Sequence, residues 1–305
     1  MSKIFSGVFP IAPTPFYDDG SIDMESQRRV LDCMIDQGVD GICILANYSE
    51  QFLISDDERT ALLDACTAHV AGRVPVIVTC SHFSTRIAAA RAKEAAERGA
   101  QMIMMMPPYH GALLKAGPQG IMEHFEAVAA AAGVPIMVQD APLSGVDLSV
   151  DLLVRMAKEI PGVSYFKIET PQTADKLRAL IATGGDSIVG PFDGEESITL
   201  MADLNAGATG TMPSALLPDL IKPVLTHHAA GDTAAAAALY ADILPLINFE
   251  NRQCGLRACK TIMKEGGVIT SDYVRHPLPP LPAGTRDQLL ELVRPLAPVA
   301  LTWGL

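Results

Sequence analysis

The chain has no excess of basic residues and no long apolar run. Its 305 residues include 23 Lys and Arg against 35 Asp and Glu, a formal net charge of -12. Nucleic acids and anionic membrane surfaces are therefore not expected partners. No apolar run approaches the roughly 20 residues of a membrane span, and the opening residues "MSKIFSGVFP" do not have the pattern of a signal peptide. We expect a soluble cytoplasmic protein.

The sequence also lacks the residue spacings typical of metal and disulfide sites. Six cysteines are scattered through apolar stretches, and no two have zinc-ribbon or CxxC spacing. We expect them to be core thiols in a reducing compartment. The seven histidines show no metal-ligand spacing with carboxylates, so we expect neither a metal nor another cofactor.

Short apolar runs alternate with alanine-rich segments along the first three quarters of the chain. Eight runs are expected to be strands: 7–14, 41–45, 75–80, 101–106, 135–139, 163–168, 187–190 and 208–212. Several of the segments between them start with Ser, Thr or Asp and end at Gly, as capped helices do. Eight strand–helix units predict a parallel sheet closed into an α/β (β/α)8 TIM barrel. An open doubly wound sheet is the alternative, although no GxGxxG follows the first run.

The pattern changes near residue 225. Beyond it, helix-like stretches such as "DTAAAAALYADILPLINFE" follow one another with no strand between them, and "HPLPPLPAG" is a rigid connector. We predict a barrel over residues 1–225 that carries the catalytic site, and a C-terminal helical region over residues 226–305.

One expected strand, "VSYFKI", contains a lysine near its end. Side chains alternate along a strand, so Lys167 and Glu169 should share the face opposite the apolar Phe166. Active sites of barrels lie at the carboxyl ends of the strands. A desolvated lysine there can act as a free amine and form a Schiff base with a ketone. On the strand alone, a Lys–Glu ion pair without catalytic function explains the pattern equally well.

Five motifs in order give the chain a resemblance to a known family. They are "TPFYDDGSID" (14–23), "GICILANYSEQ" (41–51), "PPYHG" (107–111), "YFKIE" (165–169) and "VRHPLPPL" (274–281). Together they resemble the dihydrodipicolinate synthase / N-acetylneuraminate lyase family, Schiff-base lyases on a barrel with a C-terminal helical region. The resemblance covers nearly the whole chain.

The resemblance implies a role for each residue that matches a family motif. Lys167 becomes the Schiff-base lysine. Asn47 and Tyr48 stand where the family has two hydroxyl residues that hold the substrate carboxylate. Tyr109 matches a tyrosine used at a subunit contact, and His110 replaces a second one; we include both among the substrate-binding candidates. The resemblance also implies a homo-oligomer, a tetramer built from dimers.

The stretch "MVQDAP" (137–142) departs from the family pattern. The family has its acid–base tyrosine where this chain has Gln139, and a glutamine cannot donate and recover a proton as a phenol does. We expect Gln139 to orient the substrate, and carboxylates to carry the protons. Glu169 is one candidate. The other lies in "DGEES" (193–197), where Glu196 is our choice, with Asp193 and Glu195 as alternatives.

These departures indicate a dehydration rather than a carbon–carbon cleavage. Family members that act on a substrate with a second carboxylate often carry an arginine just after the proline that corresponds to the last residue of "QDAP". This chain has no basic residue directly after "QDAP", so a hydroxylated 2-oxo acid is the expected small-molecule partner. The resemblance points most to the 2-keto-3-deoxy-L-arabonate dehydratase branch, which converts its substrate to 2-oxoglutarate semialdehyde. Two alternatives stay open: a pyruvate-dependent 2-keto-3-deoxy acid aldolase, and a non-catalytic regulator that binds a 2-oxo acid.

Overall fold

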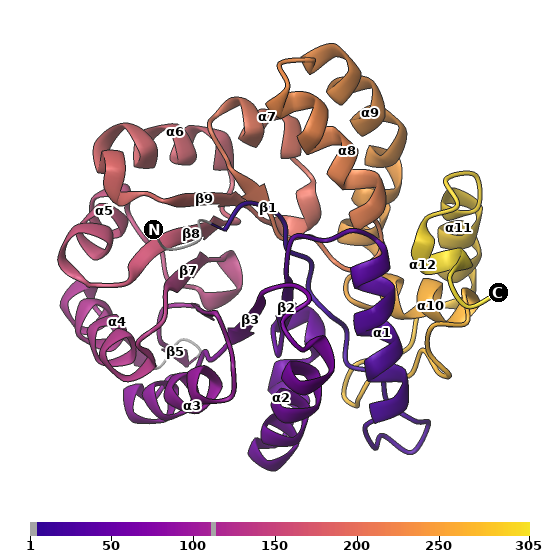
Figure 1. The fold of residues 1–305 in the computed structure, drawn as a ribbon, viewed down its shortest axis with the longest axis horizontal. Helices are drawn as coiled ribbons and strands as arrows, with labels where there is room; N and C mark the ends of the chain where they lie inside the picture. The colour runs from indigo at the N-terminus through magenta and orange to yellow at the C-terminus, as the bar shows by residue number, and fades with distance from the viewer. Residues whose placement is uncertain (1–4, 111–113) are drawn as a thin grey trace. The chain divides into compact units, whose positions relative to one another are not determined.

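The computed structural model describes residues 5–110 and 114–305 (Figure 1). The described residues form two compact units. The first comprises residues 5–6, 76–194 and 202–211, and the second comprises Gly7–Pro75, Glu195–Met201 and Met212–Leu305. Each unit combines parallel strand segments with helices, so the chain is an α/β protein, and its last part is helical.

The first unit is built on six parallel strands in the order β10-β9-β8-β7-β4-β3. Their bounds are β3 Val76–Thr79, β4 Met102–Met105, β7 Ile136–Asp140, β8 Val163–Ile168, β9 Gly190–Asp193 and β10 Gly210–Thr211. Nearly every residue in these strands is buried. Burial on both faces explains why the strands are continuous apolar runs in the sequence.

Helices connect these strands and lie outside them in Figure 1. They are α3 Thr85–Glu97, α4 Pro118–Ala132, α5 Val150–Glu159 and α6 Thr173–Gly184, with the short helices η3 Pro142–Ser144 and η4 Gly185–Ser187. Part of α7, Leu200–Asn205, also belongs here. The strands β5 Tyr109–His110 and β6 Leu114–Lys115 form a separate antiparallel pair. The last residue of the "PPYHG" motif, Gly111, lies outside the described residues.

The second unit contains two short strands and most of the helices. Its elements are β1 Gly7–Val8, β2 Ile42–Ile44, α1 Met24–Asp36, η1 Asn47–Ser49, η2 Gln51–Leu53, α2 Asp56–Val70, η5 Glu195–Ser197, α8 Pro218–Ala229, α9 Thr233–Phe249, the π-helix η6 Glu250–Cys254, α10 Arg257–Glu265, α11 Ala283–Val293 and α12 Val299–Thr302. Ile11 bridges in parallel to both Cys43 and Ser214. Helix α2 begins with the predicted capping geometry, because the Ser55 side chain accepts a hydrogen bond from the Glu58 N–H and the Glu58 carboxylate accepts from the Ser55 N–H.

Most expected strands lie where the sequence predicts them, with two differences. The expected strand 7–14 is only β1 and an isolated bridge at Ile11. The expected strand 187–190 is wrong by three residues, since β9 is Gly190–Asp193. The apolar Ile188 and Val189 suggested the earlier position, and Pro191, which lacks an N–H for the sheet, concealed the true one.

The other expectations concern the helices and the cysteines. In residues 226–305, all of which are described, helices follow one another without a strand, as predicted. All six cysteines are buried and none is in a disulfide. Within the described ranges, no helix is long and apolar enough to cross a membrane. The predicted boundary between residues 225 and 226 stays a prediction.

Candidate active site

A lysine, a carboxylate and an amide meet at the ends of β7 and β8. The Lys167 Nζ lies 2.5 Å from Glu169 Oε1. The Gln139 side-chain amide donates to both carboxylate oxygens of Glu169 at 3.3 Å. Gln139 and Lys167 are direct register partners on neighbouring strands. The structure therefore brings together three of the predicted site residues, all in the first unit.

Burial and strand alternation place these groups on one face. Lys167 is 3% exposed and Gln139 is 2% exposed. The position where a side chain would begin on Gly194 lies 3.0 Å from Lys167 Cε and also meets Glu169 Cγ. The Lys167 and Glu169 side chains thus share a face, as the alternation predicts, and they lie against a backbone that has no side chain of its own. A charged amine this buried needs its carboxylate partner.

Asp140 and Asp193 end the strands on either side of β8 and point the other way. Both are register partners of Ile168, so their side chains share its face, opposite to that of Lys167. Asp140 is fully buried and forms a 2.6 Å ion pair with Lys176 of α6. Burial raises the pKa of the Asp140 carboxyl, and Lys176 opposes the shift. This orientation weakens the alternative in which Asp193 is the proton carrier.

Asp193 forms a buried cluster with Asp203 and Thr211. The Thr211 hydroxyl donates to Asp193 Oδ2, and all three residues are fully buried. Burial, and next the hydrogen-bonded Asp203 carboxylate, raise the pKa of Asp193 well above its usual range; Thr211 and the charge of Lys167 oppose this shift.

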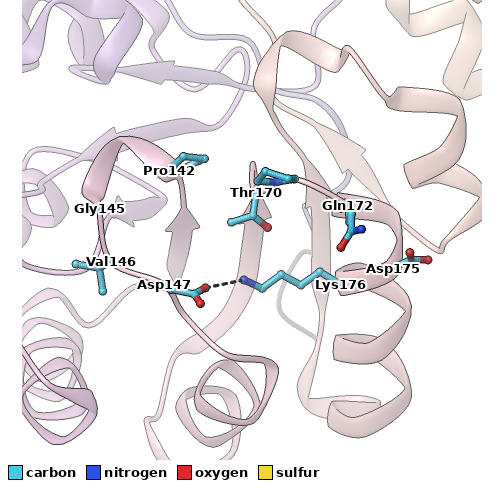
Figure 2. A pocket seen from close by; sticks show the side chains of 9 residues that line it. Pro142, Gly145, Val146, Asp147, Thr170, Gln172, Asp175 and Lys176 are labelled. Carbon is cyan, nitrogen blue, oxygen red and sulfur yellow. Dashed lines mark ion pairs between the residues drawn. The ribbon is translucent and has the colours of Figure 1, made fainter.

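The first unit contains a pocket of about 440 Å³ beyond the ends of β7 and β8. It lies between the loop after β7 and the start of α6, and Thr170, the residue after Glu169, is in its lining (Figure 2). The Lys176 ammonium at its base lies 4.0 Å from Asp147 as well as contacting Asp140. Since Lys176 pairs with Asp140, whose side chain lies on the face opposite to Lys167, this pocket is separate from the face that carries Lys167 and Glu169.

Tyr109 and His110 lie on β5 in the first unit. Tyr109 is half-buried, and burial raises the pKa of its phenol. His110 is exposed, and its ring lies 5.8 Å from that of Phe83. Strand β5 pairs with β6 and not with the sheet that carries Lys167 and Glu169. The predicted substrate-binding roles of Tyr109 and His110 therefore stay predictions.

Asn47 and Tyr48 lie in the second unit, in the short helix η1 directly after β2. Both are half-buried, and the Gln51 side-chain amide donates to Asn47 Oδ1 at 2.6 Å. Glu50 ends this turn in a left-handed conformation with φ of 59°. Its buried carboxylate pairs with the fully buried Lys260 of α10 and accepts the Arg275 N–H at 2.9 Å. Lys260 of α10 and the backbone N–H of Arg275 thus hold Glu50, which follows Asn47 and Tyr48 in this turn.

Glu196 also belongs to the second unit and lies in a strained turn. Glu195, Glu196 and Ser197 have φ of 49°, 57° and 68°, three left-handed residues in succession without a glycine. Asn251 Nδ2 donates to Glu196 Oε2 at 2.9 Å, and Glu196 is 8% exposed. Glu195 is paired instead with Arg252 at 3.4 Å. The two glutamates are therefore in different environments, and Glu196 is the more buried one.

Comparisons with known proteins identify the family. The profile described as the Dihydrodipicolinate synthetase family matches residues 4–295. The chain belongs to this family. The expected resemblance is confirmed. Among the described residues, no group of three or more His, Cys, Asp and Glu side chains could hold a metal ion.

Relatives cover nearly the whole chain. It is 55% identical over 298 residues to the L-2-keto-3-deoxyarabonate dehydratase of Azospirillum brasilense, covering 98% of this chain and 96% of the relative. It is 30% identical to a 4-hydroxy-tetrahydrodipicolinate synthase of Salinibacter ruber, covering 91% of each. A crystal structure of a putative dihydrodipicolinate synthetase from Pseudomonas aeruginosa matches with a TM-score of 0.90 and 29% identity, covering 96% of this chain and 99% of that one.

Several polar residues near the "DGEES" segment were not predicted from the sequence. Asp203, Thr211, Glu250 and Asn251 each contact or influence a carboxylate of the "DGEES" segment. They lie 6 or more positions away from that segment in the sequence. No motif links them to it, so only the fold reveals their proximity.

Proposed function

We infer that this protein is a Schiff-base-forming hydro-lyase that dehydrates a 2-keto-3-deoxy sugar acid. The substrate we propose is 2-keto-3-deoxy-L-arabonate, and the product is 2-oxoglutarate semialdehyde. The observation that carries the proposal is the buried Lys167–Glu169 pair held by Gln139 in place of the family's tyrosine. The 55% identity to a relative with this name supports the choice of substrate.

The proposed reaction begins when the Lys167 amine attacks the 2-oxo carbon and water leaves, which gives an iminium. The iminium withdraws electrons and acidifies the C3 protons. Glu169 lies 2.5 Å from the lysine nitrogen, within reach of an atom one bond from the imine carbon, and it takes one C3 proton. The enamine that forms expels the C4 hydroxyl, which accepts a proton from Glu196 and departs as water. Loss of a C5 proton and protonation of C3 then turn the C3=C4 double bond into a C4=C5 enol, which rearranges to the C5 aldehyde. Hydrolysis of the imine frees 2-oxoglutarate semialdehyde from Lys167.

Gln139 has a positioning role in this scheme. Its amide donates to both Glu169 oxygens, and it has no titratable proton. A tyrosine here could take the proton from the C4 hydroxyl while the C3–C4 bond breaks to an aldehyde and an enamine, and could later return it to C3. A glutamine leaves the carboxylates as the proton carriers, which favours elimination of a hydroxyl over release of pyruvate. Asn47 and Tyr48 are proposed to hold the substrate carboxylate.

We further propose that the strands of the two units close into a (β/α)8 barrel over residues 1–225, followed by the helical region 226–305. The family likeness over almost the full length supports this closure. We also propose a homotetramer with Tyr109 and His110 near a subunit contact. Sedimentation velocity at micromolar concentration should give a tetramer, and a monomer alone would contradict this part.

A panel of 2-keto-3-deoxy acids with product identification tests the function. The proposal expects 2-oxoglutarate semialdehyde from the five-carbon L-acid and no pyruvate. Pyruvate plus an aldehyde in a coupled assay would establish the aldolase instead. Binding of a 2-oxo acid without turnover of any panel member would favour the non-catalytic regulator.

A further inference from the structure

The turn that carries Glu196 is held from several sides within the second unit. The Tyr240 hydroxyl lies 2.9 Å from Ser197 O and 2.7 Å from Ile198 O, and it donates to these carbonyls. Three left-handed residues in succession are strained, so such a turn persists only where its surroundings fix it. Strain of this kind is found most at functional sites, and here it sets the direction of the Glu196 side chain.

The contacts to the two glutamates come from a π-helix. Asn251 and Arg252 lie in η6, which continues α9 with the wider π geometry. Asn251 donates to Glu196 and Arg252 pairs with Glu195. A π turn is rare and is common at functional sites, since it redirects side chains that a regular helix would point elsewhere. In this π-helix the successive residues Asn251 and Arg252 both contact the strained turn.

Glu250 begins this π-helix and is buried. It is 2% exposed, and its Oε1 has no hydrogen-bond partner in the described part of the chain. Burial, and then repulsion from Glu196, raise the pKa of the Glu250 carboxyl to about 8, while a hydrogen bond with Ser214 opposes this. The titratable groups that face it are Glu196, Cys254 and Cys259, and both thiols have raised pKa values to which Glu250 contributes. Burial and the oxygen without a partner therefore favour the neutral form of Glu250 at neutral pH.

We propose that Glu196 and Glu250 form a carboxyl pair that holds one proton between them, and that Asn251 orients Glu196 to deliver this proton to the leaving hydroxyl. The inference rests on the proposed dehydration, and it names the pair of carboxyl groups that holds the proton for the leaving hydroxyl. Glu196 is the group that touches the substrate, and Glu250 and Asn251 are positioning residues that act through it. Neither was expected from the sequence.

The pair balances the proton count of the elimination. Glu169 takes one proton from C3, and Glu196 gives one proton to the C4 oxygen, which leaves as water. The pair then carries two negative charges in a buried place, which favours recovery of a proton before the next turnover. Glu169 returns its proton to solvent, so the enzyme regains its starting state without an oxidant or a reductant.

The test compares Glu250→Gln with the matched control Glu291→Gln, an exposed glutamate on α11. Glutamine keeps the size of Glu250 and removes its proton. The rate constant kcat for the five-carbon acid is measured from pH 5.5 to 10. Glu250→Gln should lower kcat at pH 7.5 by about 10²-fold and move the alkaline limb to lower pH. The control should reproduce the wild-type profile. A lower kcat with an unmoved limb indicates a merely structural role and overturns the proposal.

Two further measurements keep the inference testable on its own. Infrared difference spectra of wild type against Glu250→Gln should show a neutral carboxyl band that titrates near pH 8, whatever reaction the enzyme catalyses; its absence would overturn the pair. Asn251→Ala should lower kcat up to about 10²-fold with little change in KM, and an unchanged kcat would contradict the orienting role. Borohydride trapping on Lys167 should survive in both variants, so lost trapping in the wild type points to failure of the proposed function rather than of the pair.

Discussion

Lys260→Met tests whether the buried pair beneath the Asn47–Tyr48 loop stabilises the fold. Methionine keeps most of the lysine stem and removes its charge. Both side chains of the Lys260–Glu50 pair are fully buried. The Lys260 ammonium also donates to Tyr273 O at 2.9 Å and lies 4.4 Å from the ring of Phe16. Its removal leaves the Glu50 carboxylate in the core without a cation at that contact.

The expected loss follows from what Glu50 keeps. Removing one partner of a buried ion pair costs about 3–5 kcal/mol, because the other charge stays desolvated. Glu50 still accepts the Arg275 N–H at 2.9 Å, which places the expected loss at the lower end, about 3 kcal/mol. The double variant Lys260→Met/Glu50→Gln removes both charges and should regain most of this loss, since a neutral buried pair avoids the unpaired carboxylate.

Urea unfolding followed by circular dichroism, at one protein concentration, measures these differences. The matched control is Lys264→Met on the same helix, where the side chain is 40% exposed and pairs with Asp272 at 2.8 Å. That variant should lose less than about 1 kcal/mol. Two results would refute the reasoning: a Lys260→Met variant within about 1 kcal/mol of wild type, or a double variant no more stable than the single one.

Three further predictions concern the carboxylates and the reactive lysine. Lys167→Ala should abolish turnover, and borohydride with pyruvate should add mass to the wild-type Lys167 peptide only; trapping at Lys115 or Lys260 would contradict the assignment. Glu169→Gln should lower kcat by about 10²–10⁴-fold while imine trapping survives, and Gln139→Glu should lower it less, both measured by steady-state kinetics. Burial raises the pKa of Glu250 from 4.5 to about 8. The folded state then holds one proton more than the unfolded state between these values, so the free energy of unfolding should fall as pH rises, by up to about 1.4 kcal/mol per pH unit; thermal melts of Glu250→Gln should lack this slope.

The sequence was sufficient for the strand that carries Lys167 and for the face on which Glu169 lies. Alternation along an apolar strand fixes which side chains meet, and β8 has the bounds that its residues predict. The register of β9 needed the structure, because Pro191 and Gly190 obscure it in the sequence. The direction of Asp193 follows from that register, so its contact with Asp203 and Thr211 could not be predicted.

The environment of Glu196 was harder still to predict. Its left-handed turn contains no glycine that would mark it, and the π-helix follows a regular helical pattern in α9 without a break. Glu250 resembles an ordinary glutamate at the end of a helix when only its neighbours in the chain are known. Its burial is visible only in the fold. The neighbouring Asn251 contacts Glu196, which lies 55 positions away in the chain.

The residue at position 194, a glycine in this chain, offers a way to classify related enzymes by sequence. A methyl group at this position would collide with the stem of Glu169 and make a tight contact of 3.0 Å with Lys167 Cε. The residues that follow it can change without this collision, since Glu195 and Glu196 turn their side chains to other partners. We therefore expect that a relative with any larger residue here has a displaced lysine or a different base. A single codon would then separate enzymes that keep this proton-transfer geometry from those that have adopted another.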